Sequence, residues 1–237
     1  MPQNTVHINL LGGFECSSGG EAISLPLGAQ RLLSLLALRE DGLHRGGAAE
    51  CLWPESSPGR ATGCLRSALW RARRIADVTS IESVGPRLRV SAAVRVDVRV
   101  VHDHVRAALE VPTPPSTERD SDLLVAALTR ELLPDWVDDW LVLERERWGQ
   151  VRLHALEGVA QRLLSEERYL AALNATFAAI AIEPIRETPH RIMIEVHLAE
   201  GNAASALRHY QRYRALLQRE LGVAPSARMA ELARTIV

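Results

Sequence analysis

The chain contains no lysine, and all 28 of its basic residues are arginines. Arginine codons are GC-rich and lysine codons are not, so this usage indicates a high-GC genome. Aromatic residues are also scarce, at 4%, whereas alanine and leucine abound. We therefore expect mainly helical structure, with cores built from aliphatic side chains.

Long apolar runs are absent as well. No segment approaches the ~18 apolar residues that a membrane span needs. The N-terminal residues MPQNTVHINL have neither a basic lead nor a cleavage site. These absences argue against a membrane partner, and we expect a cytoplasmic protein that associates with the nucleoid.

The usual signs of catalysis are missing. The three cysteines, Cys16, Cys51 and Cys64, form no CxxC pair, and we expect them to be reduced and structural. Two close histidine pairs lack nearby carboxylate and cysteine ligands, which favours solvated or core histidines over a metal site: His102 with His104, and His190 with His197. Neither a GxxxxGK[ST] loop nor a GxGxxG motif after a strand occurs. We expect no cofactor and no enzymatic activity.

Charge is distributed unevenly along the chain. The formal net charge is -1, but residues 60–99 hold nine arginines and only three acids, a net +6. Residues 111–237 hold 15 arginines and 18 acids, a net -3. A basic region inside a nearly neutral chain indicates a polyanion partner that binds one face.

Residues 57–76, SPGRATGCLRSALWRARRIA, lie at the centre of this basic region. Their apolar residues recur at steps of three and four, which predicts a helix packed on a core. The opposite face suits a DNA major groove, because arginine binds phosphate or guanine and short hydroxyl side chains allow close approach. The alternative is a solvated basic helix face. The candidate DNA-binding residues here are Arg60, Thr62, Arg66, Ser67, Trp70, Arg71, Arg73 and Arg74.

The next segment, residues 79–90, contains two short β-branched runs around Gly85-Pro86, which predicts a hairpin. Arg87 and Arg89 follow this turn, and we expect them to reach phosphates or the minor groove. A basic helix followed by a hairpin with arginines is the layout of a winged helix.

The residues before the basic helix predict the remainder of that domain. Residues 5–27 alternate and turn like a small antiparallel sheet of about three strands. A leucine-rich helix is expected from Gly28 to near Asp41, and a second one from Arg45 to Leu52. We expect Trp53 to fill a core position. The loop 54–59 then serves as a connector or as a docking surface beside DNA.

The C-terminal part has a different pattern. Residues 94–101 alternate as a strand that finishes the sheet or leads out of the domain, residues 101–109 are helix-like, and VPTPPS at 111–116 reads as a linker. Helices are then expected at 121–133 and from 140 to 164. An internal repeat with a period of 34 residues aligns Ala172 with Ala206, which is typical of tetratricopeptide helix pairs. A generic helical bundle is the alternative.

Together these segments resemble the Streptomyces antibiotic regulatory protein family. The most specific segments are LLPDWVDDWLVLERERW (132–148), RLHALEGVAQRLL (152–164), RYLAAL with AIAIEPIRETPHR (168–191), residues 197–226 and ATGCLRSALWRARR (61–74). The resemblance implies a mainly α fold with a small β component: an OmpR-type winged helix (α+β) at 1–110, a linker at 111–119, and an all-α, tetratricopeptide-like bacterial transcriptional activator domain at 120–237.

The resemblance also implies a function. We expect a transcriptional activator that binds tandem direct repeats in double-stranded DNA as a side-by-side homodimer and recruits RNA polymerase holoenzyme, at a cluster for secondary-metabolite (antibiotic) biosynthesis. The loop before the recognition helix is expected to face the polymerase: Glu55, Ser56, Ser57, Pro58 and Gly59. The alternative is a helical-repeat scaffold or ligand-sensing regulator whose winged helix docks protein instead of DNA.

Overall fold

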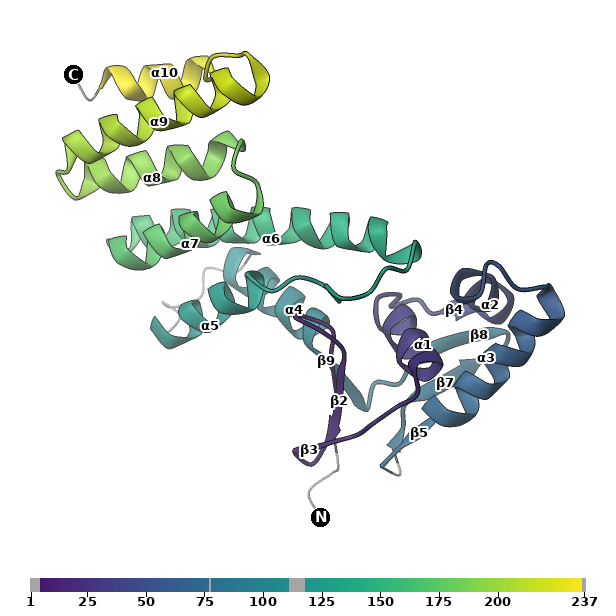
Figure 1. Ribbon diagram of the computed structural model, residues 1–237. Helices are drawn as coiled ribbons and strands as arrows, with labels where there is room; N and C mark the ends of the chain where they lie inside the picture. The colour runs from purple at the N-terminus through teal and green to yellow at the C-terminus, as the bar shows by residue number, and fades with distance from the viewer. Residues whose placement is uncertain (1–4, 77, 111–117, 236–237) are drawn as a thin grey trace. The chain divides into compact units, whose positions relative to one another are not determined.

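The computed structural model describes residues 5–76, 78–110 and 118–235. Its contacts divide the chain into two compact units (Figure 1): Met1–Asp103 with Arg130–Arg147, and His104–Thr129 with Trp148–Val237. All the strands named in the described residues belong to the first unit, and the second unit is built from helices. The predicted fold class, a small α+β domain and an all-α domain, is confirmed.

A four-stranded sheet opens the first unit. Three strands form the predicted antiparallel part: β1 (Val6–Asn9), β2 (Glu15–Ser18) and β3 (Glu21–Ala22). The fourth strand, β9 (Val94–Val96), pairs parallel with β1, so the order is β3-β2-β1-β9. The alternating segment 94–101 therefore does finish the sheet, but only its first three residues are strand.

Asp97 explains why that strand ends early. Its carboxylate accepts hydrogen bonds from the backbone N–H groups of Leu10 and Leu11, both at 2.9 Å, and of Val98 at 2.7 Å. The last of these satisfies an unpaired donor at the start of helix α4 (Asp97–Glu110). Burial raises the pKa of the Asp97 carboxyl, and the three N–H donors partly offset that effect.

Three helices and a second sheet form the winged helix of the first unit. The helices are α1 (Leu27–Ala37), α2 (Arg45–Leu52) and α3 (Pro58–Ala72). The sheet has the order β4-β8-β7 and consists of β4 (Leu43–His44), β7 (Ile81–Val84) and β8 (Arg87–Val90). A short ribbon of β5 (Arg74–Ile75) and β6 (Val78–Thr79) joins α3 to β7. The core side chains Leu32, Leu36, Leu52 and Leu88 are fully or almost fully buried.

Residues 130–147 complete the first unit. The N–H of Leu133 donates to the carbonyl of Leu10 at 2.8 Å, next to a bridge between Leu11 and Leu132. Arg145 donates to the carbonyls of Leu132, Leu133 and Trp136 and so holds this turn together. Ion pairs join Arg31 to Asp138 and Arg39 to Glu144. This turn therefore packs on the first sheet and on α1, which the sequence did not indicate.

The predicted domain limits, 1–110 and 120–237, stay a prediction, because compactness does not by itself define a part that folds alone. The predicted linker, 111–119, lies outside the described residues as far as 117. Its last two residues belong to helix α5 (Glu118–Leu128). The helix expected at 121–133 thus begins earlier and ends earlier. Its predicted last residues belong to the turn described above, where Leu132 bridges Leu11 and Leu133 takes a left-handed φ of 44°.

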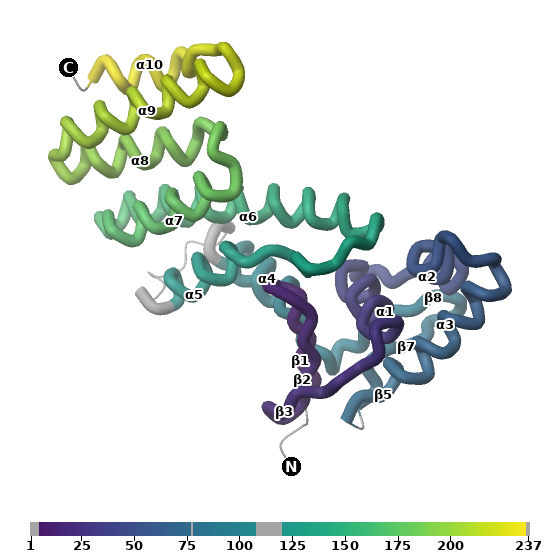
Figure 2. The backbone as a smooth tube through the Cα atoms, viewed as in Figure 1, coloured from purple at the N-terminus to yellow at the C-terminus, as the bar shows by residue number. Residues whose placement is uncertain are grey.

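Helices in consecutive pairs build the second unit (Figure 2): α6 (Trp140–Ser165), α7 (Tyr169–Ile182), α8 (Glu187–Ala199), α9 (Ala203–Leu221) and α10 (Ala227–Arg234). Helices α7 and α9 begin 34 residues apart, in agreement with the predicted period. Ala172, Ala175 and Ala206 are fully buried, so these small residues let neighbouring helices approach closely.

A stacked aromatic cluster joins α8 to α9. The Nε2 of His190 lies 2.8 Å from the carbonyl of Pro184, which can only accept, so this nitrogen carries the proton. Burial lowers the pKa of His190, and in its neutral form the Nδ1 accepts from Nε2 of His209, at 2.9 Å. Tyr213 stacks on His190 with centroids 4.2 Å apart and donates to the carbonyl of Ile185. Burial, followed by the nearby His190, lowers the pKa of His209 to about 4.

A first prediction concerns Gly42, between α1 and β4. Its φ is +70°, and a Cβ there would lie 2.5 Å from the carbonyl oxygen of Leu88. We expect Gly42→Ala to lower the free energy of unfolding by about 2–4 kcal/mol, from backbone strain and this clash together. Gly85→Ala is the matched control: φ is +58° but the space is open, so we expect a loss of ~1 kcal/mol. Urea denaturation followed by tryptophan fluorescence measures both; equal losses would contradict the clash.

A second prediction concerns pH. Because the pKa of His209 is about 4 in the folded chain and 6.5 for an ordinary histidine, the unfolded chain binds more protons between these values. Stability should be greatest above pH ~6.5 and fall as the pH drops toward 4. We expect His209→Gln, which keeps an N–H donor but cannot titrate, to lose less Tm than the parent on acidification to pH ~5. Circular dichroism gives Tm; exposed His104→Asn is the control, and an undiminished loss in His209→Gln would refute the prediction.

Candidate nucleic-acid interface

Helix α3 has one buried face and one exposed face. Its buried side chains, Ala61, Leu65, Ala68, Leu69 and Ala72, follow the predicted apolar stripe and pack on α1 and α2. The polar residues predicted for the other side are all exposed: Arg60, Thr62, Arg66, Ser67, Trp70, Arg71 and Arg73. The helix thus presents its arginines to solvent, as a DNA-reading helix must.

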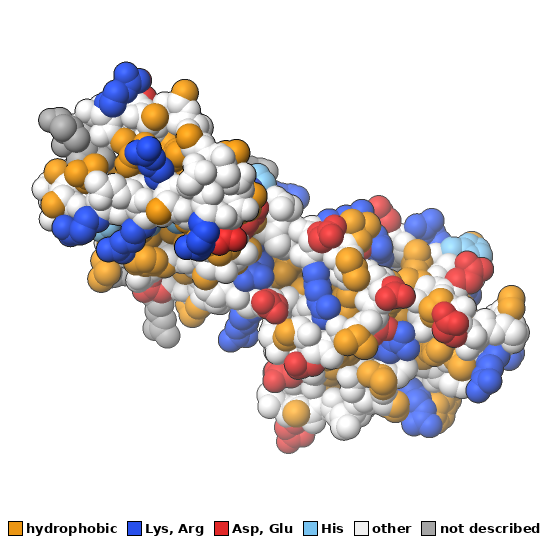
Figure 3. All heavy atoms as spheres, turned by 45° about the horizontal axis from the view of Figure 1, so that its top comes forward, with side chains coloured by type: hydrophobic (Ala, Val, Ile, Leu, Met, Phe, Trp, Pro, Cys, Tyr) orange, Lys and Arg blue, Asp and Glu red, His pale blue; other side chains and the backbone are white. Residues whose placement is uncertain are grey.

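The arginines of this face keep their charge unpaired. Within the part of the chain that the structure describes, the guanidinium groups of Arg60, Arg66 and Arg73 have no hydrogen-bond or ion-pair partner. The guanidinium of Arg71 lies over the ring of Trp70, with Cζ 5.9 Å from the ring centroid, and has no acidic partner among the described residues. The local sequence explains this, because no acid occurs between Glu55 and Asp77. Figure 3 shows acidic and basic side chains interspersed over its right-hand part.

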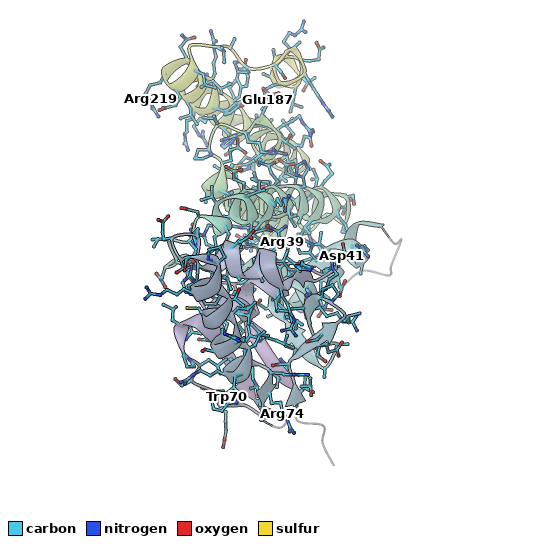
Figure 4. The ribbon with its side chains drawn as sticks, turned by 90° about the vertical axis from the view of Figure 1, so that its right-hand side faces the viewer. Arg39, Asp41, Trp70, Arg74, Glu187 and Arg219 are labelled. Atoms are coloured by element: carbon cyan, nitrogen blue, oxygen red, sulfur yellow. The ribbon has the colours of Figure 1, made fainter. Side chains whose placement is uncertain are left out.

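Helix α3 is shorter than predicted. It ends at Ala72, so Arg73 is its C-cap and Arg74 lies on β5, whereas both were predicted to lie on the helix. Ser80 causes this end: its hydroxyl donates to the carbonyl of Ala72, and its backbone N–H donates to that of Arg73 at 2.9 Å. These bonds replace the helical partners of the last carbonyls. Arg74 remains exposed at the same edge as Trp70 (Figure 4).

Both wing arginines are engaged within the first unit. The guanidinium of Arg87 donates to the carbonyls of Asp41 at 3.3 Å and Gly42 at 3.0 Å. That of Arg89 donates twice to one carboxylate oxygen of Glu82, at 2.7 and 2.9 Å. The hydrogen bonds from Arg89 and then Ser91 lower the pKa of Glu82. The wing is therefore less positive than its arginines suggest.

The pairing of Glu82 with Arg89 was missed, although the sequence contains its signal. A two-residue turn at Gly85-Pro86 makes Val84 face Arg87, and the register then sets Glu82 opposite Arg89. A second omission is His44, whose Nδ1 accepts from the N–H of Gly46 at 3.2 Å and caps α2.

The predicted polymerase-facing loop is divided by the structure. Glu55 and Ser57 are exposed in the connection between α2 and α3, and Ser56 is half-buried there. Pro58 and Gly59 instead belong to the first turn of α3. Proline suits this position, because the backbone N–H that it lacks would have no partner within the helix. The free loop is thus shorter than the segment predicted.

The described residues hold neither a metal-ligand cluster nor a helix that could span a membrane. Among residues 5–76, 78–110 and 118–235, no three histidine, cysteine or acidic side chains come together as metal ligands would. No helix in the same described ranges combines the length and the apolar character that crossing a membrane requires. The three cysteines are free thiols, as predicted.

Known proteins of similar sequence are regulators. Over 98% of its length the chain is 29% identical to the regulatory protein AfsR of Streptomyces coelicolor. Over 99% it is 26% identical to the regulatory protein AfsR of Streptomyces griseus. The chain covers 24% and 25% of these proteins, so it spans about a quarter of their length. The predicted resemblance to the antibiotic regulatory proteins is confirmed.

A solved structure has the same fold. Mycobacterium tuberculosis EmbR, determined in complex with a low-affinity phosphopeptide, superposes with a TM-score of 0.75 at 18% identity, covering 98% of this chain and 65% of that one. The family model of the bacterial transcriptional activator domain matches residues 96–237, more than half of the chain. The chain therefore belongs to the bacterial transcriptional activator domain family.

Proposed function

We propose that this chain is a sequence-specific DNA-binding activator, with no enzymatic step, and that α3 lies in the major groove. The observation that carries the proposal is the exposed face of α3, where four arginines have no acidic partner among the described residues. Unpaired guanidinium groups on a helix of this size bind phosphates and guanine edges. Membership of an activator family agrees with this role.

The wing would sit beside the phosphate backbone. Arg89 is half exposed in its pair with Glu82, and its guanidinium can exchange that carboxylate for a phosphate. Arg87 is tied to two backbone carbonyls, so we assign it mainly to holding the wing against the turn at Gly42. Arg74, exposed on β5, extends the basic surface beyond the end of α3.

Two copies would bind side by side on tandem direct repeats and recruit RNA polymerase holoenzyme at an antibiotic-biosynthesis cluster. The exposed residues Glu55 and Ser57 are the part of the α2–α3 connection that we assign to the polymerase. In the second unit, Leu170 and Phe177 are 74% and 57% exposed on α7. They lie seven residues apart, on one helix face, which supports a protein partner for that unit. Residues 1–110 would bind DNA and residues 120–237 would contact partners.

The decisive experiment begins with sequences selected from a random DNA pool. We expect two half-sites about one helical turn apart. Arg66→Ala combined with Arg73→Ala should weaken binding by about 30- to 10,000-fold, because two contacts worth roughly 1–3 kcal/mol each are lost. The dependence of log K on log salt should become shallower by up to about 2. Fluorescence anisotropy at several salt concentrations measures both.

The matched control is Arg95→Ala, which removes an exposed arginine from β9 outside the proposed interface. It should change the affinity by less than about twofold. If the double variant binds like the parent, or if binding barely depends on salt, the alternative of a helical-repeat scaffold or ligand sensor that docks protein would replace this proposal.

The ion pair between Glu82 and Arg89 in the wing leads to a further prediction. We expect Glu82→Gln to raise the affinity for the selected DNA about two- to fivefold at low salt, because it removes a negative charge near the phosphates and releases Arg89. The same anisotropy assay measures the effect. Glu21→Gln, an exposed acid on β3, changes the net charge equally and is the control. A weaker complex with Glu82→Gln would show that this carboxylate positions Arg89 instead of competing for it.

A further inference from the structure

Trp70 is exposed in a way that the fold does not require. It is 81% exposed near the end of α3, whereas Trp148 is buried. An indole is among the largest apolar surfaces that a side chain can offer, and leaving it in water gains nothing for folding. Such exposure in the middle of a binding face points to a contact made only in a complex.

The position of Trp70 on the helix is central. With a turn of about 100° per residue, Trp70 lies within about 25° of the line opposite the five buried side chains of α3. Gly63 lies on the same line two turns earlier, and a Cβ there would meet nothing within 4 Å. The helix can thus approach a groove closely at Gly63 and fill it at Trp70.

The neighbours of Trp70 limit what it can contact. Arg66 and Ser67 lie one turn earlier on the exposed face, and Arg73 lies three residues later. The guanidinium of Arg71 sits 5.9 Å from the ring centroid, where a cation–π contact orients the indole and leaves N–H donors free for a phosphate. Polar side chains that suit phosphates and base edges therefore surround a single apolar one.

The major groove offers few apolar groups. Guanine presents two acceptors there, cytosine a donor, and adenine an acceptor and a donor, whereas thymine presents a methyl group beside its O4 acceptor. The indole has an apolar ring and one N–H donor, with no acceptor. Its ring matches the methyl group of thymine, and its N–H matches the O4 acceptor. The indole cannot stack on a base that stays paired in the duplex.

We propose that Trp70 selects thymine in the target by packing its indole against the C5-methyl group; this inference rests on the proposed function of α3 as a major-groove helix. The arginines supply most of the affinity, and Trp70 fixes one position of each half-site. A contact between the indole N–H and a phosphate would instead hold for every sequence alike.

The test removes one methyl group at a time. In the selected site, each thymine is replaced by deoxyuridine, which pairs in the same way but lacks the C5-methyl group. We expect one or two thymines per half-site at which the replacement weakens binding by the parent about three- to fivefold, the worth of one buried methyl group. Trp70→Ala should bind the two DNAs equally, and Trp70→Leu should keep part of the difference.

Arg66→Ala is the control variant, because it should weaken binding to both DNAs while preserving their ratio. Since Trp70 is exposed, its replacement leaves the core of α3 intact. A parent that ignores every deoxyuridine, or a Trp70→Ala variant that still distinguishes the two DNAs at the sensitive position, would overturn the inference while leaving DNA binding in place. A parent with no selected site at all would overturn the proposed function as well.

Discussion

Burial of one apolar stripe on α3 determines what the first unit can present to a partner. Leu65 and Leu69 pack on α1 and α2, and burial of each leucine contributes about 1.5–3 kcal/mol. A rotation of the helix by about half a turn would expose both and would bury Ser67 and Trp70, whose hydroxyl and N–H groups would find no partner in a leucine core. The exposed face is therefore fixed by the core, and every interpretation of Trp70 and its arginine neighbours depends on that constraint.

The two units obtain their order in different ways. In the first unit, charged groups serve the backbone: Asp97 accepts three N–H groups, Arg99 donates to the carbonyl of Ala37 at the end of α1, and Arg145 donates to three carbonyls of one turn. In the second unit, small residues bring helices together, and buried polar side chains also bond to the backbone: Arg152 donates to the carbonyl of Leu128 at 2.6 Å, and His190 contacts that of Pro184.

Periodicity in the sequence predicted most of the elements, because strands and helices bury residues at different spacings. The pattern correctly predicted the first sheet, α1, α2, the hairpin of the wing and the start of α6. It failed where a distant group decides the outcome: Ser80 ends α3 at Ala72, and the carboxylate of Asp97 ends β9. Residues 129–133 were predicted as helix for the same reason, since the partner of Leu133, Leu10, lies over a hundred residues away.

The same distinction holds for the candidate site: the sequence predicts which residues are exposed, but only the structure gives their partners. The residues that face outward on α3 follow from helix geometry alone, so the sequence was sufficient for them. Whether an arginine is available depends on its partners, and here the structure separates Arg66 from Arg89: the first has no acid nearby, and the second faces Glu82 across the hairpin. Positive charge concentrates on α3 because that helix contains no acid, while each wing arginine is already engaged. A polyanion would therefore gain most from α3, and the wing could bind only by exchanging contacts that it already makes.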